Sequence, residues 1–162
     1  MKDTGTQPLW KIVEDPTISV KDKLSHLLLK ATGVLRQDIG MISQVNGQTY
    51  RIVFVTDEAA IHAEDTFNLG DTYCGLVIRQ GQVLSIDTMR VPSQYRHPCH
   101  EVLRVESYIG VPVYASPGLF GTLNFISSRQ RTSPFDEMDR EFADKVGAMI
   151  GEVLDQWLAQ SK

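Results

Sequence analysis

The apolar positions of the chain change their period along its length, and this change predicts a mixture of helices and strands. Between residues 19 and 33, four apolar residues repeat at helical spacing: Leu24, Leu27, Leu28 and Ala31. Ser19 precedes them in the N-cap position, and Asp22 follows three residues later, as in a capping box. The pattern predicts a first helix that begins after Ser19 and ends near Gly33.

The strands are predicted as two hairpins. Apolar runs at 39–45 and 48–55 flank Asn46-Gly47, a strong hairpin signal because both central residues of a type I′ turn have positive φ. A second pair of runs, 108–114 and 118–125, flanks a Ser-Pro-Gly turn. Gly121 has no side chain and therefore marks a bulge or a place where backbone or ligand comes close.

A short helix, a further strand and a long final helix complete the predicted elements. Asp71 can cap a helix over 72–79, and 83–86 is typical of a buried strand. Asp136 caps the final helix, which carries two apolar faces. One comprises Phe142, Val146, Met149 and Val153, and the other comprises Ile150, Leu154, Trp157 and Leu158.

The two apolar faces of the final helix predict self-association. One face is enough to cover a sheet, so the other could meet a partner helix in a homodimer formed through the terminal helices. The alternative is that the N-terminal residues, with Trp10 and Ile12, cover that surface within one chain.

The order of these elements predicts the fold class. We expect an α+β fold: an antiparallel β-sheet of five to six strands with helices on its faces. The 162 residues are long enough for one domain with a sizeable core. We expect an N-terminal extension over 1–18 and a single domain over 19–160.

Composition narrows the function classes. A formal net charge of -4 disfavours nucleic-acid binding, which needs clustered lysine and arginine. No apolar run approaches the roughly 20 residues that span a bilayer, so we expect no membrane association. The two cysteines do not make a disulfide framework, which favours the reducing cytoplasm.

Two strings carry a family resemblance. The second hairpin, 108–114 (YIGVPVY) with 118–125 (GLFGTLNF), resembles the GAF domain, and 133–139 (SPFDEMD) resembles that family's entry to its last helix. A looser similarity lies at 69–75 (LGDTYCG). The resemblance covers about 19–158. It implies a GAF/PAS-like fold and a small-molecule-sensing regulatory domain of a bacterial signal-transduction protein, in which ligand binding is coupled to the terminal helices.

The resemblance identifies no ligand or cofactor, but it implies a site between the sheet face and its connecting loops. By strand alternation, Phe54, Tyr108 and Asn124 are expected to face inward, together with Gly110. Other candidates come from the short helix and from the irregular segment 87–106, and could close the pocket: Tyr73, Cys74, His97, Cys99 and His100.

The same cysteines and histidines raise three other hypotheses. A metal site is not expected, because three candidate ligands crowd into 97–100, unlike the paired spacing of zinc sites. Cys99-His100 resembles the dipeptide that attaches a bilin in photosensory GAF domains, although too few residues separate it from Pro112. Free methionine-R-sulfoxide reductases, which are stand-alone GAF proteins, would use Cys74 and Cys99. No complete catalytic arrangement emerges, which favours a non-enzymatic binding module.

Overall fold

The computed structural model describes residues 7–58, 61–70, 73–87, 105–116 and 118–160. In chain order these residues form α1 (Gln7–Glu14), α2 (Val20–Val34), β1 (Ile39–Asn46), β2 (Thr49–Val55), β3 (Thr66–Asn68), α3 (Tyr73–Gln80), β4 (Leu84–Ile86), β5 (Ser107–Ala115), β6 (Gly118–Ser127) and α4 (Glu137–Gln160).

The six strands form one antiparallel sheet in the order β3-β2-β1-β6-β5-β4. Each predicted hairpin is present, and the pairing of β1 with β6 joins the two hairpins at the centre of the sheet. The predicted α+β fold with an antiparallel sheet is therefore confirmed. The short edge strand β3 was not anticipated, because its three residues are too few for alternation to show.

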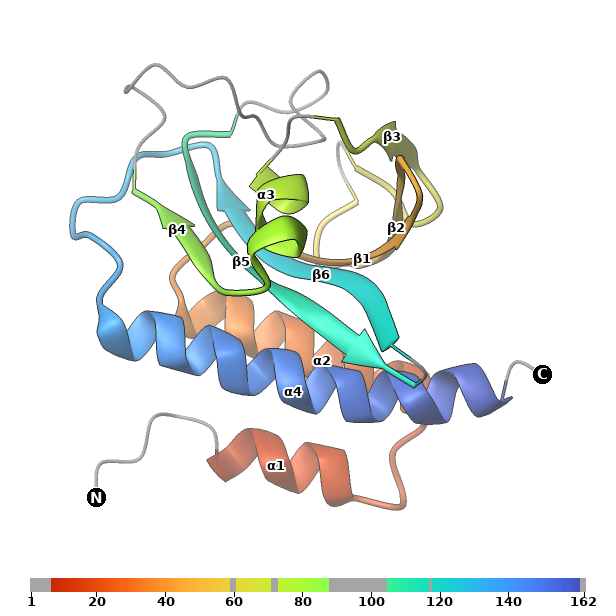
Figure 1. Cartoon of the computed structure of the whole chain (residues 1–162). Helices are drawn as coiled ribbons and strands as arrows, with labels where there is room; N and C mark the ends of the chain where they lie inside the picture. Colours follow the sequence, from red (N-terminus) through yellow and green to blue (C-terminus); the bar gives the residue numbers. More distant parts are fainter. Residues whose placement is uncertain (1–6, 59–60, 71–72, 88–104, 117, 161–162) are drawn as a thin grey trace.

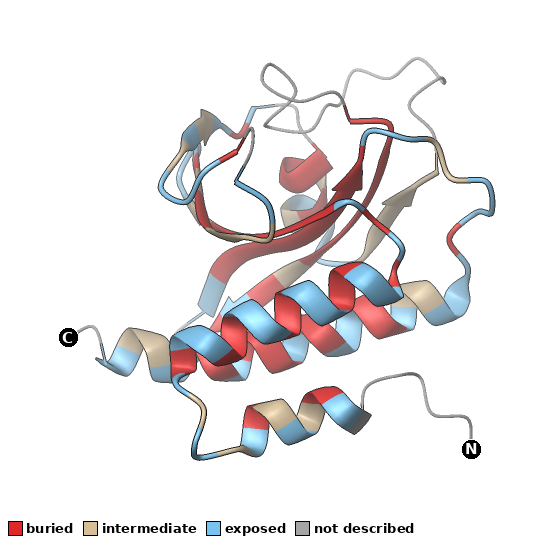
Figure 2. Ribbon diagram, turned by 180° about the vertical axis from the view of Figure 1, so that it is seen from behind, coloured by how far each residue is buried: buried red, intermediate tan, exposed pale blue. Residues whose placement is uncertain are grey.

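The helices divide unequally between the two faces of the sheet. Helices α2 and α4 lie side by side on one face, α1 packs outside them, and α3 lies on the opposite face (Figure 1). Figure 2 shows that α2 and α4 bury the stripes that face the sheet and expose the others. No helix among the described residues is long and apolar enough to cross a membrane.

The helix starts agree with the capping pattern in the sequence. The Ser19 hydroxyl accepts a hydrogen bond from the Asp22 backbone N–H at 3.1 Å. Asp136 and Asp139 form a reciprocal pair at α4, in which each carboxylate accepts from the other's backbone N–H, at 2.8 and 3.0 Å. Such pairs satisfy amide groups that have no partner within the helix. The predicted cap of α3, Asp71, lies outside the described residues.

The turn of the first hairpin differs by one residue from the expected one. Asn46 pairs with Thr49, so Gly47 and Gln48 are the central turn residues. Gly47 has a φ of 61°, whereas Gln48 is not among the residues with positive φ. A single left-handed residue at the first central position is the pattern of a type II′ turn, not the type I′ turn that Asn-Gly predicts.

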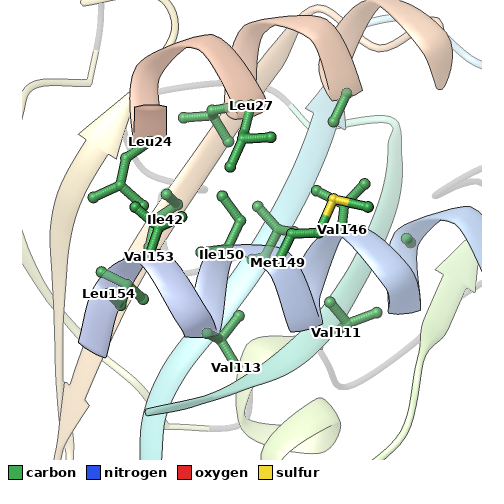
Figure 3. Close-up of a cluster of buried hydrophobic side chains, with 14 of the residues drawn as sticks. Leu24, Leu27, Ile42, Val111, Val113, Val146, Met149, Ile150, Val153 and Leu154 are labelled. Carbon is green, nitrogen blue, oxygen red and sulfur yellow. The ribbon is translucent and has the colours of Figure 1, made fainter. Parts of the chain in front are cut away.

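The second apolar face of α4 is covered within the chain. Ile150 and Leu154 of this face are fully buried, as are Met149 and Val153 of the first face, in a cluster built from α2, α4 and the strands beneath them (Figure 3). Trp157 and Leu158 pack half-buried against the same cluster. Leu9 and Val13 of α1 join this cluster, so part of the predicted extension 1–18 belongs to the same core. The covered apolar faces of α4 therefore give no support to a homodimer, which stays a prediction.

Gly121 marks a close approach of two backbones, which the sequence predicted as one of its possible roles. A Cβ atom at this position would overlap the carbonyl oxygen of Ser43 on the neighbouring strand β1. Phe120, the preceding residue, is an extra residue in the β5–β6 pairing, because Val113 pairs with Gly121 and Tyr114 with Leu119. Glycine at 121 therefore allows β1 and β6 to pair beside a bulge.

We predict that Gly121→Ala destabilises the domain by roughly 1–3 kcal/mol or more, because the added methyl group meets backbone that cannot rotate away. Gly33→Ala is the matched control. It lies in α2 with nothing within 4 Å of an added Cβ, and it should stabilise the domain by about 0.5–1 kcal/mol. Urea unfolding followed by circular dichroism measures both changes. Equal stability of Gly121→Ala and the wild type would contradict this account of the β1–β6 contact.

Candidate functional site

A cluster of uncharged polar side chains lies between α3 and the sheet. Cys74 of α3 and Tyr108 of β5 are both fully buried, and the thiol sulfur lies 3.5 Å from the phenol oxygen. The Tyr108 ring crosses Gly110, where a Cβ atom would overlap its hydroxyl end. Tyr73 packs on the same ring, with the two centroids 5.4 Å apart. The glycine in β5 thus gives the tyrosine room to lie along the sheet.

Strands β1, β2 and β6 supply the rest of this polar cluster. The Asn124 amide donates hydrogen bonds to the Tyr50 hydroxyl at 2.8 Å and to the Thr122 hydroxyl at 3.3 Å. Ser43 pairs with Thr122 and lies two residues after Met41, whose side chain packs on the α3 face, so alternation places its hydroxyl on this face too. Ser43 Oγ is buried and has no hydrogen-bond partner among the described residues.

The burial of the cluster keeps its acidic groups protonated. Burial raises the pKa of the Cys74 thiol, although hydrogen bonding to Tyr108, Tyr50 and Thr122 acts in the opposite direction. Burial also raises the pKa of Tyr108 well above its usual value, and the neighbouring Cys74 adds to this effect. At neutral pH the cluster is therefore uncharged and offers hydroxyl, amide and thiol groups. Such groups can orient an uncharged polar ligand.

Four of the predicted site residues meet in this cluster, namely Tyr73, Cys74, Tyr108 and Asn124. Phe54 does not, and its assignment to this face of the sheet was wrong. Val53 is an extra residue in β2, because Ile42 pairs with Phe54 while Ser43 pairs with Ile52. This bulge shifts the alternation, and Phe54 instead packs edge-on against Trp157 of α4, with ring centroids 5.7 Å apart.

Three predicted residues, His97, Cys99 and His100, lie outside the described part of the chain. The described ranges contain no group of three His, Cys, Asp or Glu side chains that could hold a metal ion. Sequence reasoning missed Ser43, Tyr50 and Thr122. These residues could have been recognised as polar residues in otherwise apolar strands that are covered on both faces. A buried hydroxyl in such a strand needs a specific hydrogen-bond partner.

The arrangement is that of a small α+β domain with a polar cluster beneath a short helix. The model of the family described as GAF domain matches residues 21–154. The chain therefore belongs to the GAF domain family, and the resemblance of the second hairpin and of 133–139 to that family is confirmed. No sequence among the curated proteins matches the chain.

Solved structures share the fold at low sequence identity. The GAF domain from an Acinetobacter phosphoenolpyruvate-protein phosphotransferase has a TM-score of 0.76 and 16% identity, with all of both chains covered. The GAF domain of a two-component sensor histidine kinase from Bacillus halodurans has a TM-score of 0.71 and 12% identity, with 90% of this chain and 100% of that one covered.

A third solved structure is an enzyme. The free methionine-R-sulfoxide reductase from Neisseria meningitidis, in complex with its substrate, has a TM-score of 0.73 and 15% identity, covering 100% of this chain and 96% of that one. At these identities the three similarities establish the fold alone. The sulfoxide reductase shares this fold with domains of a phosphotransferase and of a sensor histidine kinase, so the fold does not decide between binding and catalysis.

We predict that the Cys74 thiol resists modification in the folded protein. In a Cys99→Ser variant Cys74 is the only thiol, and it should react with a disulfide reagent far more slowly in buffer than in urea, because burial blocks access and disfavours the thiolate. Rapid labelling of the folded protein at neutral pH would contradict the buried, protonated state.

The raised pKa of Cys74 also has a stability consequence. Below the thiol's ordinary value of 9.0, its ionisation leaves the free energy of unfolding unchanged. Above that pH the unfolded chain releases the proton first, so stability falls as pH rises toward the folded-state pKa. Urea unfolding across the alkaline range should show a smaller decline in Cys74→Val, in which only the other titrating groups act. An equal decline in both proteins would argue against the raised pKa.

Proposed function

We propose that the chain is a small-molecule-sensing regulatory domain of a bacterial signal-transduction protein, and that it binds rather than transforms its ligand. The observation that carries this proposal is the uncharged polar cluster between α3 and the sheet, on the face opposite α2 and α4. Membership of the GAF family supports a sensory role.

The Ser43 hydroxyl supports a ligand at this cluster. A buried polar group without a partner costs about 1–3 kcal/mol, and a ligand oxygen or nitrogen could supply the missing hydrogen bond. Tyr50 and Asn124 lie on the same face and provide further hydroxyl and amide groups. Because all of these side chains are fully buried, a ligand reaches them only when part of the structure that covers this face of the sheet, such as α3, moves away.

The strands beneath the cluster provide a route to the terminal helices. Tyr108 and Asn124 face α3, whereas their neighbours Ile109, Val111 and Leu123 pack in the cluster that contains α4. A displacement of β5 or β6 on ligand binding would therefore be felt by the helix on the other face. This arrangement favours the coupling to the terminal helices that the GAF resemblance implies.

The state of Cys74 argues against the enzymatic alternative. A sulfoxide reductase needs an attacking thiolate, whereas burial raises the pKa of Cys74. Catalysis would then depend on Cys99, and so would bilin attachment. Both alternatives therefore rest on a residue outside the described ranges.

The remaining parts of the proposal concern partners and location. We keep the homodimer through the terminal helices and the cytoplasmic location as parts of it. Sedimentation equilibrium measures the first. A monomer at tens of micromolar, a range typical of assays for weak association, would remove the dimer from the proposal without affecting ligand binding.

We predict that protein purified from its native host carries a small molecule that native mass spectrometry detects and that denaturation releases. Ser43→Ala removes a hydroxyl that has no hydrogen-bond partner within the described ranges, so it should keep the fold and lower ligand occupancy. Ser25→Ala, the same substitution at an exposed position of α2, is the matched control. Equal ligand occupancy in Ser43→Ala and the wild type would show that the ligand does not bind at this cluster.

We also predict no turnover of free methionine-R-sulfoxide in a thioredoxin-coupled assay. Turnover by the wild type that disappears in Cys99→Ser would contradict the binding module and favour the reductase. Absorbance spectra of the same preparation detect a bound bilin or haem. A visible band that is lost in Cys99→Ser would instead favour the photosensory alternative.

A further inference from the structure

A second polar feature lies at one end of the sheet, where two connections meet. The α2–β1 connection and the β6–α4 connection enclose a solvent-open hollow of about 190 Å³. We call it the arginine hollow. Its lining includes Arg36, Gln37, Ser127, Arg129, Arg131 and Ser133. It shares no residue with the polar cluster beneath α3. Three arginines gather here in a chain whose net charge is -4.

Arg36 occupies a backbone conformation that usually requires glycine. Its φ is 55°, and it follows Leu35, the C-cap of α2. The Arg36 N–H donates to the Gly33 carbonyl, and the Gln37 N–H donates to the Thr32 carbonyl, both at 3.1 Å. These two bonds define a Schellman motif, whose left-handed position favours glycine. An arginine at this position departs from the local preference and places a cation at the hollow.

Arg131 ties the two connections together. Its guanidinium donates to the Leu35 carbonyl at 2.7 Å, to the Gln37 side-chain oxygen at 3.2 Å and to the Ser133 carbonyl at 3.0 Å. The same group lies 3.9 Å from the centre of the Phe135 ring. These contacts fix the wall of the hollow, so Arg131 has a structural role whether or not a ligand binds.

The charges around the hollow are only partly neutralised. Arg129 pairs with Asp38 at 2.7 Å, and Arg131 lies 3.9 Å from Asp139. Arg36 donates one hydrogen bond, at 3.4 Å, to the Ser133 hydroxyl, and it forms no ion pair with a carboxylate of the described residues. Arg36 is therefore the cation of the hollow that a ligand can pair.

The pKa of Arg131 reflects both the positive and the negative charges around the hollow. Burial lowers it, and the like charge of Arg36 lowers it further. Asp139, Asp87 and Asp136 act in the opposite direction. Both guanidinium groups line the hollow, and an anion bound there would offset the repulsion between their charges.

We propose that the arginine hollow binds the phosphate group of a small phosphorylated metabolite. Guanidinium groups match the geometry of phosphate oxygens, and serine hydroxyls can donate further hydrogen bonds to them. Pockets that enclose drug-sized ligands measure roughly 300–1,000 Å³. The smaller, open hollow suits one anionic group, with the rest of the molecule outside it.

Titration of the ¹⁵N-labelled full chain tests the proposal at low ionic strength, because salt screens exposed charges. The probes are glycerol phosphate, inorganic phosphate and acetate. Glycerol phosphate should shift the amide signals of Arg36, Gln37 and Ser133 in a saturable way. Inorganic phosphate should do so too if the phosphate group is sufficient for binding, whereas binding of the monoester alone would show that the organic part contributes. Either result supports the proposal.

The decisive variant is Arg36→Gly. Glycine adopts the left-handed conformation without strain, so the variant should unfold at the same or a higher temperature than the wild type. Its affinity for glycerol phosphate should nevertheless fall at least tenfold, because the unpaired guanidinium is lost. Arg36→Gln repeats the loss with a side chain of similar length. Lys30→Gln removes the same charge from an exposed position on α2 and should bind as the wild type does.

Three results would overturn the proposal. The first is the absence of saturable shifts with either phosphate probe. The second is unchanged affinity in Arg36→Gly and Arg36→Gln. The third is acetate binding as tight as that of the phosphates, which would make the hollow a general anion site.

Discussion

Strand β1 pairs with β6 over six residue pairs, from Ile39 with Ile126 to Gln44 with Gly121. This pairing joins two hairpins that are far apart in the sequence. It places β1 and β6 at the centre of the sheet, where both faces of these strands are buried. The close approach of Gly121 to the Ser43 carbonyl belongs to the same contact. The apolar cluster with α2 and α4, and the polar cluster beneath α3, both depend on these strands being adjacent.

The two faces of this sheet are built differently. The face toward α2 and α4 is almost entirely apolar, with Ile42, Val111 and Leu123 packed on the helices. The face toward α3 combines apolar residues with the hydroxyls, amide and thiol of the polar cluster. Apolar packing on the first face contributes roughly 25 cal/mol per Å² of buried area and can hold the sheet together. The second face can then carry groups that are costly to bury.

Local patterns in the sequence predicted most of the elements. Apolar spacing located α2 and α4, and the caps Ser19 and Asp136 fixed where they begin, because these signals involve residues within one turn of each other. The two hairpins were also local signals. The pairing of β1 with β6 was not predicted, since it depends on contacts between segments with no pattern in common. The packing of the N-terminal residues on the helices was predicted only as the alternative to a dimer.

The candidate site was predicted less completely than the fold. Tyr108 and Asn124 were placed on the correct face by simple alternation, but the extra residue Val53 moved Phe54 to the other face. A bulge leaves no mark in an apolar run such as 52–55, so alternation alone cannot detect it. The left-handed Arg36 was missed for a related reason. The expected signal for this left-handed position is glycine, whereas Gly33, which marked the helix end to within one residue, lies in the last turn of α2.

The length of α4 gives the domain a mechanical property. Its 24 residues, at 1.5 Å of rise each, make a rod of about 36 Å. Asp139 in its first turn lies 3.9 Å from Arg131, whereas Trp157 in its last turns packs against Phe54 of β2. A rotation of about 5° around the first turn would carry the far end through about 3 Å. If α4 moved as one rigid body, a small displacement at its first turn would therefore become a larger one at its C-terminal end.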